Sequence, residues 1–268
     1  MPTVNDVYSY LCALAPVELK MDFDNVGLLV GRSEAAVSKI LVSLDITHDV
    51  ISEALDTGSD LIVSHHPLFF SLKSVTDTDI TGKKIVRLLS GGISAICMHT
   101  NLDAARGGTN DALAAAAGII NIDPETPPAQ EGSQIPDGNG FLYGRIGYIS
   151  EPAALDDYLG MLKKALKTEG LRYYDAGKKV YKVAVVSGSG GNELHHAIKN
   201  GCDTFLTSDI KYDVFLEAKE IGINLIDGDH YCTENLVTAA LVNRLSAEFP
   251  EITVTSSRVH GQTVSFYK

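Results

Sequence analysis

The sequence predicts an α/β protein made of two similar αβ domains with mostly parallel sheets. Short apolar runs typical of buried strands alternate with segments of helical periodicity along nearly the whole chain. A unit of helix, glycine, aspartate and strand occurs twice, at residues 55–64 and 198–207. Between the two copies lies a segment rich in Pro and Gly, residues 124–140, which has no periodicity and indicates a linker.

Composition limits the class of protein. The 268 residues, 45% of them hydrophobic, are enough for two globular domains, each with its own core. A formal net charge of −12 disfavours broad electrostatic binding to nucleic acid or to an anionic membrane. The four cysteines are dispersed and form no Cys-x-x-Cys pair, which favours free thiols in a reducing compartment. Because there is neither a signal peptide nor an apolar run of membrane-spanning length, we expect a soluble cytoplasmic protein.

The first predicted domain, residues 1–123, begins with a helix over 4–15, which Thr3 caps and Pro16 ends. Residues 22–31 form a turn that leads into a short strand. Strands and helices then alternate, with strands over 40–44, 61–64 and 93–98 and helices over 47–56, 82–89 and 109–117.

The second predicted domain, residues 141–268, continues the alternation after the linker. Its predicted helices cover 153–167, 193–199, 214–221 and 234–249. Its predicted strands cover 141–149, 181–186, 204–207, 223–226, 252–255 and 263–266. The last part of the chain, from about residue 230 to 268, either stays with this domain or packs back onto the first.

The repeated unit aligns functional residues as well as structural ones. In the register set by residues 55–64 and 198–207, His65-His66 falls opposite Ser208-Asp209. Residues 92–99 also resemble residues 222–230, with one residue inserted. The inference is a duplicated αβ protein with one site at the junction of the two copies. Chance similarity between two ordinary αβ units is the alternative.

The segment Ser64-His65-His66-Pro67 carries the clearest chemical signal. An apolar strand runs directly into two histidines, and the following proline favours extended backbone at His66. Ligands collect beyond the carboxyl ends of strands in open α/β sheets. Adjacent side chains on extended backbone point in different directions, so each histidine could serve a different ion. A pair of exposed loop histidines is the alternative reading.

Other potential ligands follow predicted strands or lie in the loops after them. The full set is His65, His66, His99, Asp103, Asp209, Asp227, Asp229, His230 and Glu234. His230 and Glu234 are four residues apart, which places their side chains on one face of a helical turn. Mixed imidazole and carboxylate ligands suit Zn, Fe, Mn or Ni rather than Ca.

Six motifs, taken in order, resemble a known family over nearly the whole chain. They are Asp24-Asn25-Val26-Gly27-Leu28, Ser64-His65-His66-Pro67-Leu68, His99-Thr100-Asn101-Leu102-Asp103, Gly188-x-Gly190, Thr207-Ser208-Asp209-Ile210-Lys211-Tyr212 and Asp229-His230-Tyr231-x-Thr233-Glu234. The family is the dinuclear-metal group commonly called GTP cyclohydrolase 1 type 2 homologues, or Nif-three-like proteins. The His-His-Pro and His-Tyr-x-Thr-Glu motifs are specific in combination.

The resemblance implies a site with two divalent transition-metal ions. His65 and His230 would bind one ion, His66 and Asp103 the other, and Glu234 would bridge both. It also implies assembly into a toroidal homohexamer. The chain departs from the family pattern at Phe23, where Trp is frequent, and at Asp229, where Gly is common. An added carboxylate at Asp229 would repel a substrate phosphate unless the metal ions offset its charge.

Three functions compete on this basis. The first is a metal-dependent hydrolase of GTP cyclohydrolase type, in which metal-activated water opens a purine ring or hydrolyses a nucleotide-like small molecule. His99 would then act as a proton shuttle, as a support for a ligand, or simply as a strand-end cap. The second is a non-catalytic protein for metal trafficking or a regulatory adaptor. The third, a nucleic-acid partner, is disfavoured by the acidic charge.

Overall fold

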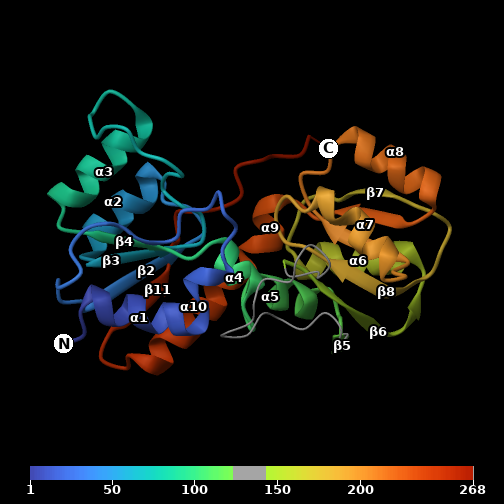
Figure 1. Cartoon of the computed structure of the whole chain (residues 1–268), viewed down its shortest axis with the longest axis horizontal. Helices are drawn as coiled ribbons and strands as arrows, with labels where there is room; N and C mark the ends of the chain where they lie inside the picture. Colours follow the sequence, from blue (N-terminus) through green and yellow to red (C-terminus); the bar gives the residue numbers. More distant parts are fainter. Residues whose placement is uncertain (123–142, 268) are drawn as a thin grey trace. The chain divides into compact units, whose positions relative to one another are not determined.

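The computed structural model describes residues 1–122 and 143–267. The chain divides into two compact units, Met1–Ala105 with Val237–Gly261 and Arg106–Leu236 with Gln262–Lys268, and each contains its own sheet (Figure 1). The predicted linker, 124–140, and the start of the predicted strand 141–149 lie outside the described residues.

These units differ from the domains predicted from the sequence. Helix α5, Thr109–Ala116, belongs to the second unit. Leu113 in this helix and Ala117 directly after it pack in the hydrophobic core of that unit. The predicted helix 234–249 is present as α10 at Leu236–Glu248, and a short helix that was not predicted, α9 at His230–Glu234, precedes it. Nearly all of α10 belongs to the first unit, and with it strand β11, Thr253–Ser256.

The first unit contains a five-stranded sheet in the order β1-β4-β3-β2-β11. Its strands are β1 (Gly27–Val30), β2 (Lys39–Ser43), β3 (Leu61–Ser64), β4 (Ser94–Cys97) and β11. All neighbouring pairs are parallel except β1 with β4. Its helical elements are α1 (Val4–Leu14), η1 (Val17–Leu19), α2 (His48–Thr57), α3 (Ile80–Ser90), α4 (Thr100–Ala104) and α10.

Helices cover both faces of this sheet: α2 and α3 lie on one face, and α1 and α10 lie on the other (Figure 1). Thr3 and Asp6 form a capping box at the start of α1, which satisfies backbone donors that a helix terminus leaves open. Thr47 caps α2, and Gly58 ends it in the left-handed conformation. The predicted cap at Thr3 is confirmed.

The second unit contains a six-stranded sheet in the order β5-β6-β8-β9-β10-β7. Its strands are β5 (Asn121–Ile122), β6 (Arg145–Ala153), β7 (Arg172–Tyr174), β8 (Val180–Val185), β9 (Thr204–Thr207) and β10 (Asn224–Asp227). The centre, β8-β9-β10, is parallel, and the flanking strands pair antiparallel. The helical elements are α5, α6 (Leu155–Ala165), η2 (Gly191–Glu193), α7 (Leu194–Lys199), α8 (Tyr212–Ile221) and α9.

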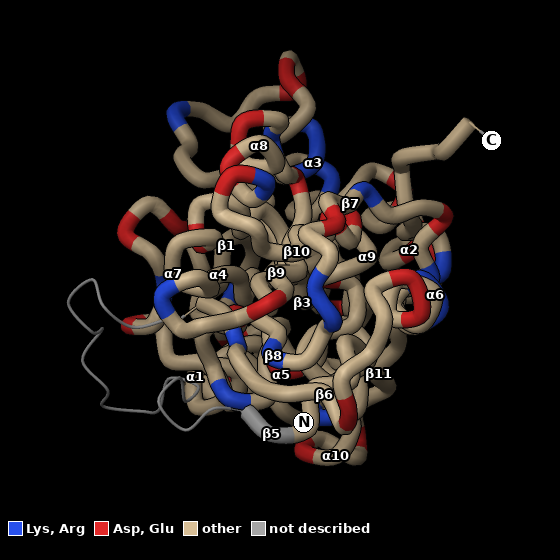
Figure 2. Tube along the Cα trace, turned by 90° about the vertical axis from the view of Figure 1, so that its right-hand side faces the viewer, with Lys and Arg blue, Asp and Glu red and all other residues tan. Residues whose placement is uncertain are grey.

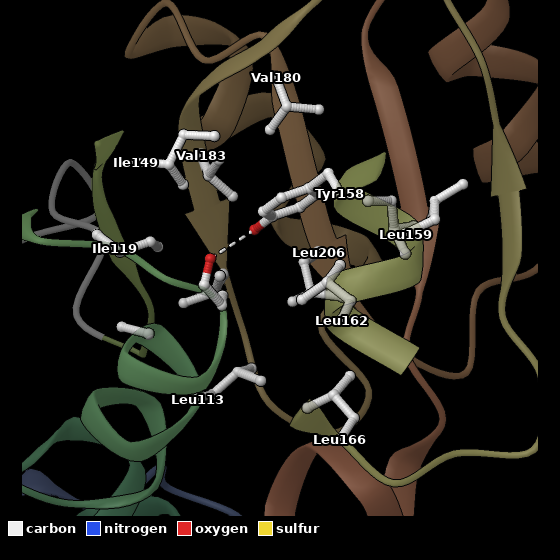
Figure 3. Close-up of a cluster of buried hydrophobic side chains, with 14 of the residues drawn as sticks. Leu113, Ile119, Ile149, Tyr158, Leu159, Leu162, Leu166, Val180, Val183 and Leu206 are labelled. Atoms are coloured by element: carbon white, nitrogen blue, oxygen red, sulfur yellow. Dashed lines mark hydrogen bonds between the residues drawn. The ribbon is translucent and has the colours of Figure 1, made fainter. Parts of the chain in front are cut away.

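Apolar clusters lie on both faces of the second sheet. Residues of α5, α6 and α9 pack on one face, and residues of α7 and α8 pack on the other. On the first face, the Tyr158 hydroxyl reaches the carbonyl oxygen of Ala117 at 3.0 Å, within a cluster that includes Leu162 and Leu206 (Figure 3). The buried hydroxyl therefore has an acceptor, as a phenol inside an apolar core requires.

The internal repeat is visible in equivalent hydrogen bonds. The Asp60 carboxylate accepts from the backbone N–H groups of Ser38 and Lys39 at 2.8 and 3.0 Å. In the second unit, the Asp203 carboxylate accepts in the same way from Tyr181 and Lys182. Each aspartate thus links the start of one central strand to the neighbouring strand by hydrogen bonds. The shared Gly-x-Asp motif therefore has a structural role in both units.

The structure corrects the register of the repeat. Ser64 pairs with Cys97 in the first sheet, and Thr207 pairs with Asp227 in the second. His99, two residues after Cys97, is the N-cap of the short helix α4. Asp229, two residues after Asp227, is the N-cap of the short helix α9. The two copies therefore align without the inserted residue that the sequence comparison suggested.

The predicted strand 263–266 is wrong, since these residues form no strand. The Val264 N–H donates to the side chain of Gln262 at 2.8 Å, and the Phe266 ring packs over Gly170. Strand β7 was not predicted, and it contains Tyr173 and Tyr174. Among the described residues, every helix is too short or too polar to cross a membrane. Acidic and basic residues are interspersed along the described trace (Figure 2).

Candidate metal centre

His65 and His66 stand directly after β3 and continue its backbone pairing. Their N–H groups donate to the carbonyl oxygens of Ser43 and Leu44 at 3.3 and 2.9 Å. The His65 side chain is fully buried, and 21% of the His66 side chain is exposed. The alternative of two exposed loop histidines is therefore excluded.

His99, the N-cap of α4, brings a third imidazole to the same place. A ligand nitrogen of each of the three histidines lies within 4.8 Å of those of the other two. The ring centroids of His65 and His66 are 5.2 Å apart, as are those of His65 and His99. These three histidines form the imidazole cluster of the first unit.

Each imidazole in this cluster has an acceptor at Nδ1. His65 Nδ1 lies 2.9 Å from the Met98 carbonyl oxygen, His66 Nδ1 lies 2.8 Å from Asp45 Oδ1, and His99 Nδ1 lies 2.9 Å from Asp24 Oδ1. A carbonyl or carboxylate acceptor assigns the proton of a neutral imidazole to Nδ1. The lone pair is then on Nε2, which is the usual arrangement of a metal-binding histidine with an oriented outer partner.

The carboxylate behind His99 is held by several donors. Asp24 accepts the backbone N–H of Thr100 at 3.0 Å and its hydroxyl at 2.5 Å, in addition to His99. Burial alone would raise the pKa of Asp24, but the hydrogen bonds from His99 and Thr100 outweigh it and lower that pKa well below its usual range. Asp24 is therefore an anion that orients His99, a role that neither its predicted turn nor its family motif indicated.

Asp103 reaches the imidazole cluster because α4 is a single helical turn. Its N–H donates to the carbonyl oxygen of His99 at 3.1 Å, and its Oδ1 lies 3.5 Å from His65 Nε2. The structure thus brings together four predicted site residues in the first unit: His65, His66, His99 and Asp103. Helix α4 itself was not predicted, because it is only five residues long.

The second unit contains a histidine–carboxylate pair. Helix α9 places His230 and Glu234 one turn apart, with His230 Nε2 at 3.0 Å from Glu234 Oε2. His230 Nδ1 lies 2.7 Å from Asp209 Oδ2. Burial lowers the pKa of His230, but the hydrogen bonds to Glu234 and Asp209 outweigh it and raise that pKa to about 9.

The turn after β8 contains Gly188 and Gly190, whose backbone N–H groups donate to threonine hydroxyls of the protein. The Gly188 N–H donates to Thr233 Oγ1 at 3.1 Å, and the Gly190 N–H donates to Thr207 Oγ1 at 2.9 Å. These donors are engaged within the protein, which favours the structural turn over a phosphate-binding loop. Gly188 also has a positive φ of 61° and lies against Glu234.

Two further candidates from the sequence have structural roles. Asp229 caps α9 by accepting the Cys232 N–H at 3.1 Å, and it also accepts from the Gln262 side chain at 2.5 Å. Asp227 pairs with the Arg172 guanidinium and accepts the Ile210 N–H. The sequence missed the part played by His260, whose Nε2 lies 3.0 Å from Asp45 Oδ2, because it stands in a segment without a recognisable motif.

Comparison with known proteins places this chain in one family. A sequence model of the family described as Duf34/NIF3 (NGG1p interacting factor 3) matches residues 2–262. A protein of Clostridium acetobutylicum named GTP cyclohydrolase 1 type 2 homolog is 33% identical over 260 residues, which are 96% of this chain and 90% of the relative. A protein of the same name from Clostridium perfringens is 35% identical over 236 residues, 86% of each chain.

Solved structures with this fold come from bacteria and archaea. A hypothetical protein of Staphylococcus aureus has a TM-score of 0.88 and 29% identity, with 99% of both chains covered. Reduced HcgD of Methanocaldococcus jannaschii has a TM-score of 0.79 and 26% identity, with 95% of this chain and 97% of that chain covered. The two-part αβ architecture is shared by these neighbours.

Proposed function

Because the chain belongs to the Duf34/NIF3 family, we propose that it is a metal-dependent hydrolase with two divalent transition-metal ions per chain. The ligands in this proposal are His65, His66, Asp103, His230 and Glu234. His65 and His230 hold one ion and His66 and Asp103 hold the other, with Glu234 as the bridge. The assignment follows the family motifs that the sequence carries at these positions.

The observation that carries the proposal is the state of the imidazole cluster. His65 and His66 each have an acceptor at Nδ1, so each presents a basic Nε2. Their two outer partners, a backbone carbonyl and a carboxylate, are the kinds of group that orient metal-binding histidines. A donor set of neutral imidazoles and carboxylates suits Zn, Fe, Mn or Ni, and the choice among them is open to experiment.

The reaction we propose is hydrolysis of a nucleotide-like small molecule, with GTP as the first candidate. The relatives described above are named GTP cyclohydrolase 1 type 2 homolog. A reaction of that type opens the guanine ring and releases formate. When bound, divalent ions would supply Lewis acidity and lower the pKa of water in the site. His99 then accepts and returns a proton at Nε2, and the Asp24 anion at Nδ1 stabilises the protonated ring.

The test is metal content and turnover in the same preparations. Elemental analysis of wild type, Glu234→Gln and the control Glu217→Gln should give about two ions per chain in the first and third and a loss in the second. Glu217 is a suitable control because it lies on α8 and is paired with the exposed His195. GTP consumption and formate release should follow the metal content. If the wild-type protein binds no transition metal after reconstitution, the proposal is wrong.

One outcome would favour the alternative function. Retention of two ions without hydrolysis of GTP or any other nucleotide would indicate a metal-trafficking protein or a regulatory adaptor. Turnover that saturates with substrate and is lost in His66→Gln would exclude that alternative.

We propose further that the protein works in the cytoplasm as a homohexamer, as the family motifs imply. None of the four cysteines, all within the described residues, is in a disulfide bond, as a reducing compartment favours. Light scattering of the purified protein at several concentrations measures the assembly directly. A monomer at all concentrations would contradict the hexamer and leave the metal site untouched.

A further inference from the structure

We propose that His260 is a positioning residue for His66 and acts through the carboxylate of Asp45. This inference rests on the proposed function, because it concerns how one of the metal ligands is held. His260 lies in the segment after β11, almost two hundred positions from His66 in the chain. Its side chain nevertheless returns to the end of β2, where Asp45 stands.

One carboxylate connects the two imidazoles. Asp45 Oδ1 lies 2.8 Å from His66 Nδ1, and Asp45 Oδ2 lies 3.0 Å from His260 Nε2. Each ring therefore faces a different oxygen of the same group. Asp45 is thus contacted by an imidazole on both sides.

The second imidazole matters because Asp45 is not fixed by burial. Its side chain is 41% exposed, whereas that of His260 is only 9% exposed. A half-exposed carboxylate with one partner rotates readily and exchanges that partner for water. His260 blocks this rotation, so Oδ1 stays in line with His66 Nδ1–H. The tautomer and the ring angle of His66 are then set before any ion binds.

His260 is itself held by the elements that carry Asp45. Its N–H donates to Ser257 Oγ at 3.2 Å, and Ser257 Oγ lies 2.5 Å from Glu53 Oε2 on α2. The Arg258 N–H donates to Glu53 Oε1 at 2.9 Å. The Ser257 N–H donates to the carbonyl oxygen of Val42 in β2 at 2.8 Å. The turn that presents His260 is thus built on β2 and α2.

The experiment compares Zn²⁺ affinity in the full chain after metal removal, by competition with a chromophoric chelator. We expect His260→Ala to weaken binding of one ion by about 10- to 100-fold, as loss of an outer partner usually does. His260→Gln keeps an N–H donor that reaches Asp45 and should recover most of the affinity. Val259→Ala is the control, since Val259 is 53% exposed and stands next to His260. Wild-type affinity in His260→Ala would overturn the inference.

Two further readouts separate positioning from general stability. In ¹⁵N-detected imidazole spectra of metal-free protein, His66 should be the Nδ1–H tautomer in wild type and a mixture of tautomers in His260→Ala. The Co²⁺ absorption spectrum should change in His260→Ala and stay close to wild type in His260→Gln. An unchanged His66 tautomer, or affinity lost only in proportion to thermal stability, would overturn the role we assign.

Glu53→Ala gives an independent variant outside the proposed ligand set, and it should reproduce part of the His260→Ala effect. Failure of the proposed function looks different: wild type itself would then bind no Zn²⁺. Tight binding by wild type together with equal binding by all four variants would leave the proposed function standing and remove only His260 from it.

Discussion

Gly188 and Glu234 occupy touching positions in the second unit. A Cβ atom on Gly188 would lie 2.0 Å from Glu234 Oε1 and 3.3 Å from His230 Nε2. The glycine also has a φ of 61°, which L side chains rarely adopt. Absence of a side chain at position 188 is thus a condition for the Glu234 carboxylate to stand where it does.

Gly188→Ala should therefore abolish metal binding, because the new methyl group displaces Glu234. Gly177→Ala is the matched control, since Gly177 has a φ of 72° and open space around its Cβ position. We expect the control to lose about 1–2 kcal/mol of unfolding free energy from backbone strain and to keep its metal. Elemental analysis and urea unfolding measure both effects. Full metal content in Gly188→Ala would contradict the prediction.

The stability of the metal-free protein should depend on the charge of His230. The pKa of this residue is raised from 6.5 to about 9 in the folded state, so protonated His230 stabilises the fold fully below pH 6.5. That contribution is lost as the pH rises through about 9. We expect a loss of roughly 1 kcal/mol, discounted because a third of the side chain is exposed.

Urea unfolding of wild type and His230→Asn across this pH range measures the effect. The variant should lack the decline that wild type shows. Metal affinity should change in the opposite direction and rise with pH, because an ion must displace the proton on His230. A wild-type stability that rises between pH 6.5 and 9 would contradict the assignment.

His99→Gln should retain the metal ions and lose turnover. Its Nε2 belongs to the imidazole cluster, but the proposed ligands do not include it, and Asp24 holds its Nδ1. Loss of a general acid–base typically costs about 10²- to 10⁴-fold in rate. The measurement is GTP turnover and metal content in the same sample, with the exposed His195→Gln as the control. Loss of an ion in His99→Gln would make His99 a ligand instead.

The buried pair of Arg145 and Asp111 should be a large contributor to stability in the second unit. The Arg145 side chain is completely buried, and its guanidinium contacts Asp111 and the carbonyl oxygen of Gly144. Arg145→Met leaves Asp111 without its cation, and we expect a loss of about 3–5 kcal/mol in urea unfolding. Arg32→Met, at an exposed position, should change the free energy of unfolding by no more than about 0.5 kcal/mol. A comparable effect at both positions would contradict this account.

The elements with strong local signals could be predicted from the sequence. Strand β3 begins and ends where the apolar run Leu61–Ser64 indicates, and Thr47 and Gly58 bound α2 as their cap chemistry requires. The Gly-x-Asp repeat was also readable, because both copies carry the same residues for the same backbone contacts. The prediction of a strand at 263–266 was wrong, because alternation of residue types along the chain does not by itself supply a partner strand.

The sequence by itself determined which side chains the proposed metal site would use. Two histidines that follow a buried strand, and a histidine four residues before a glutamate, specify imidazole and carboxylate donors through local backbone geometry alone. Only the tertiary structure decided what stands behind those donors. Asp45 and His260 lie outside the sequence motifs, Asp24 lies in a motif that does not reveal its partner, and each reaches that partner through contacts between segments far apart in the chain. Long-range packing places these groups, so the orientation of the imidazoles is a property of the folded protein.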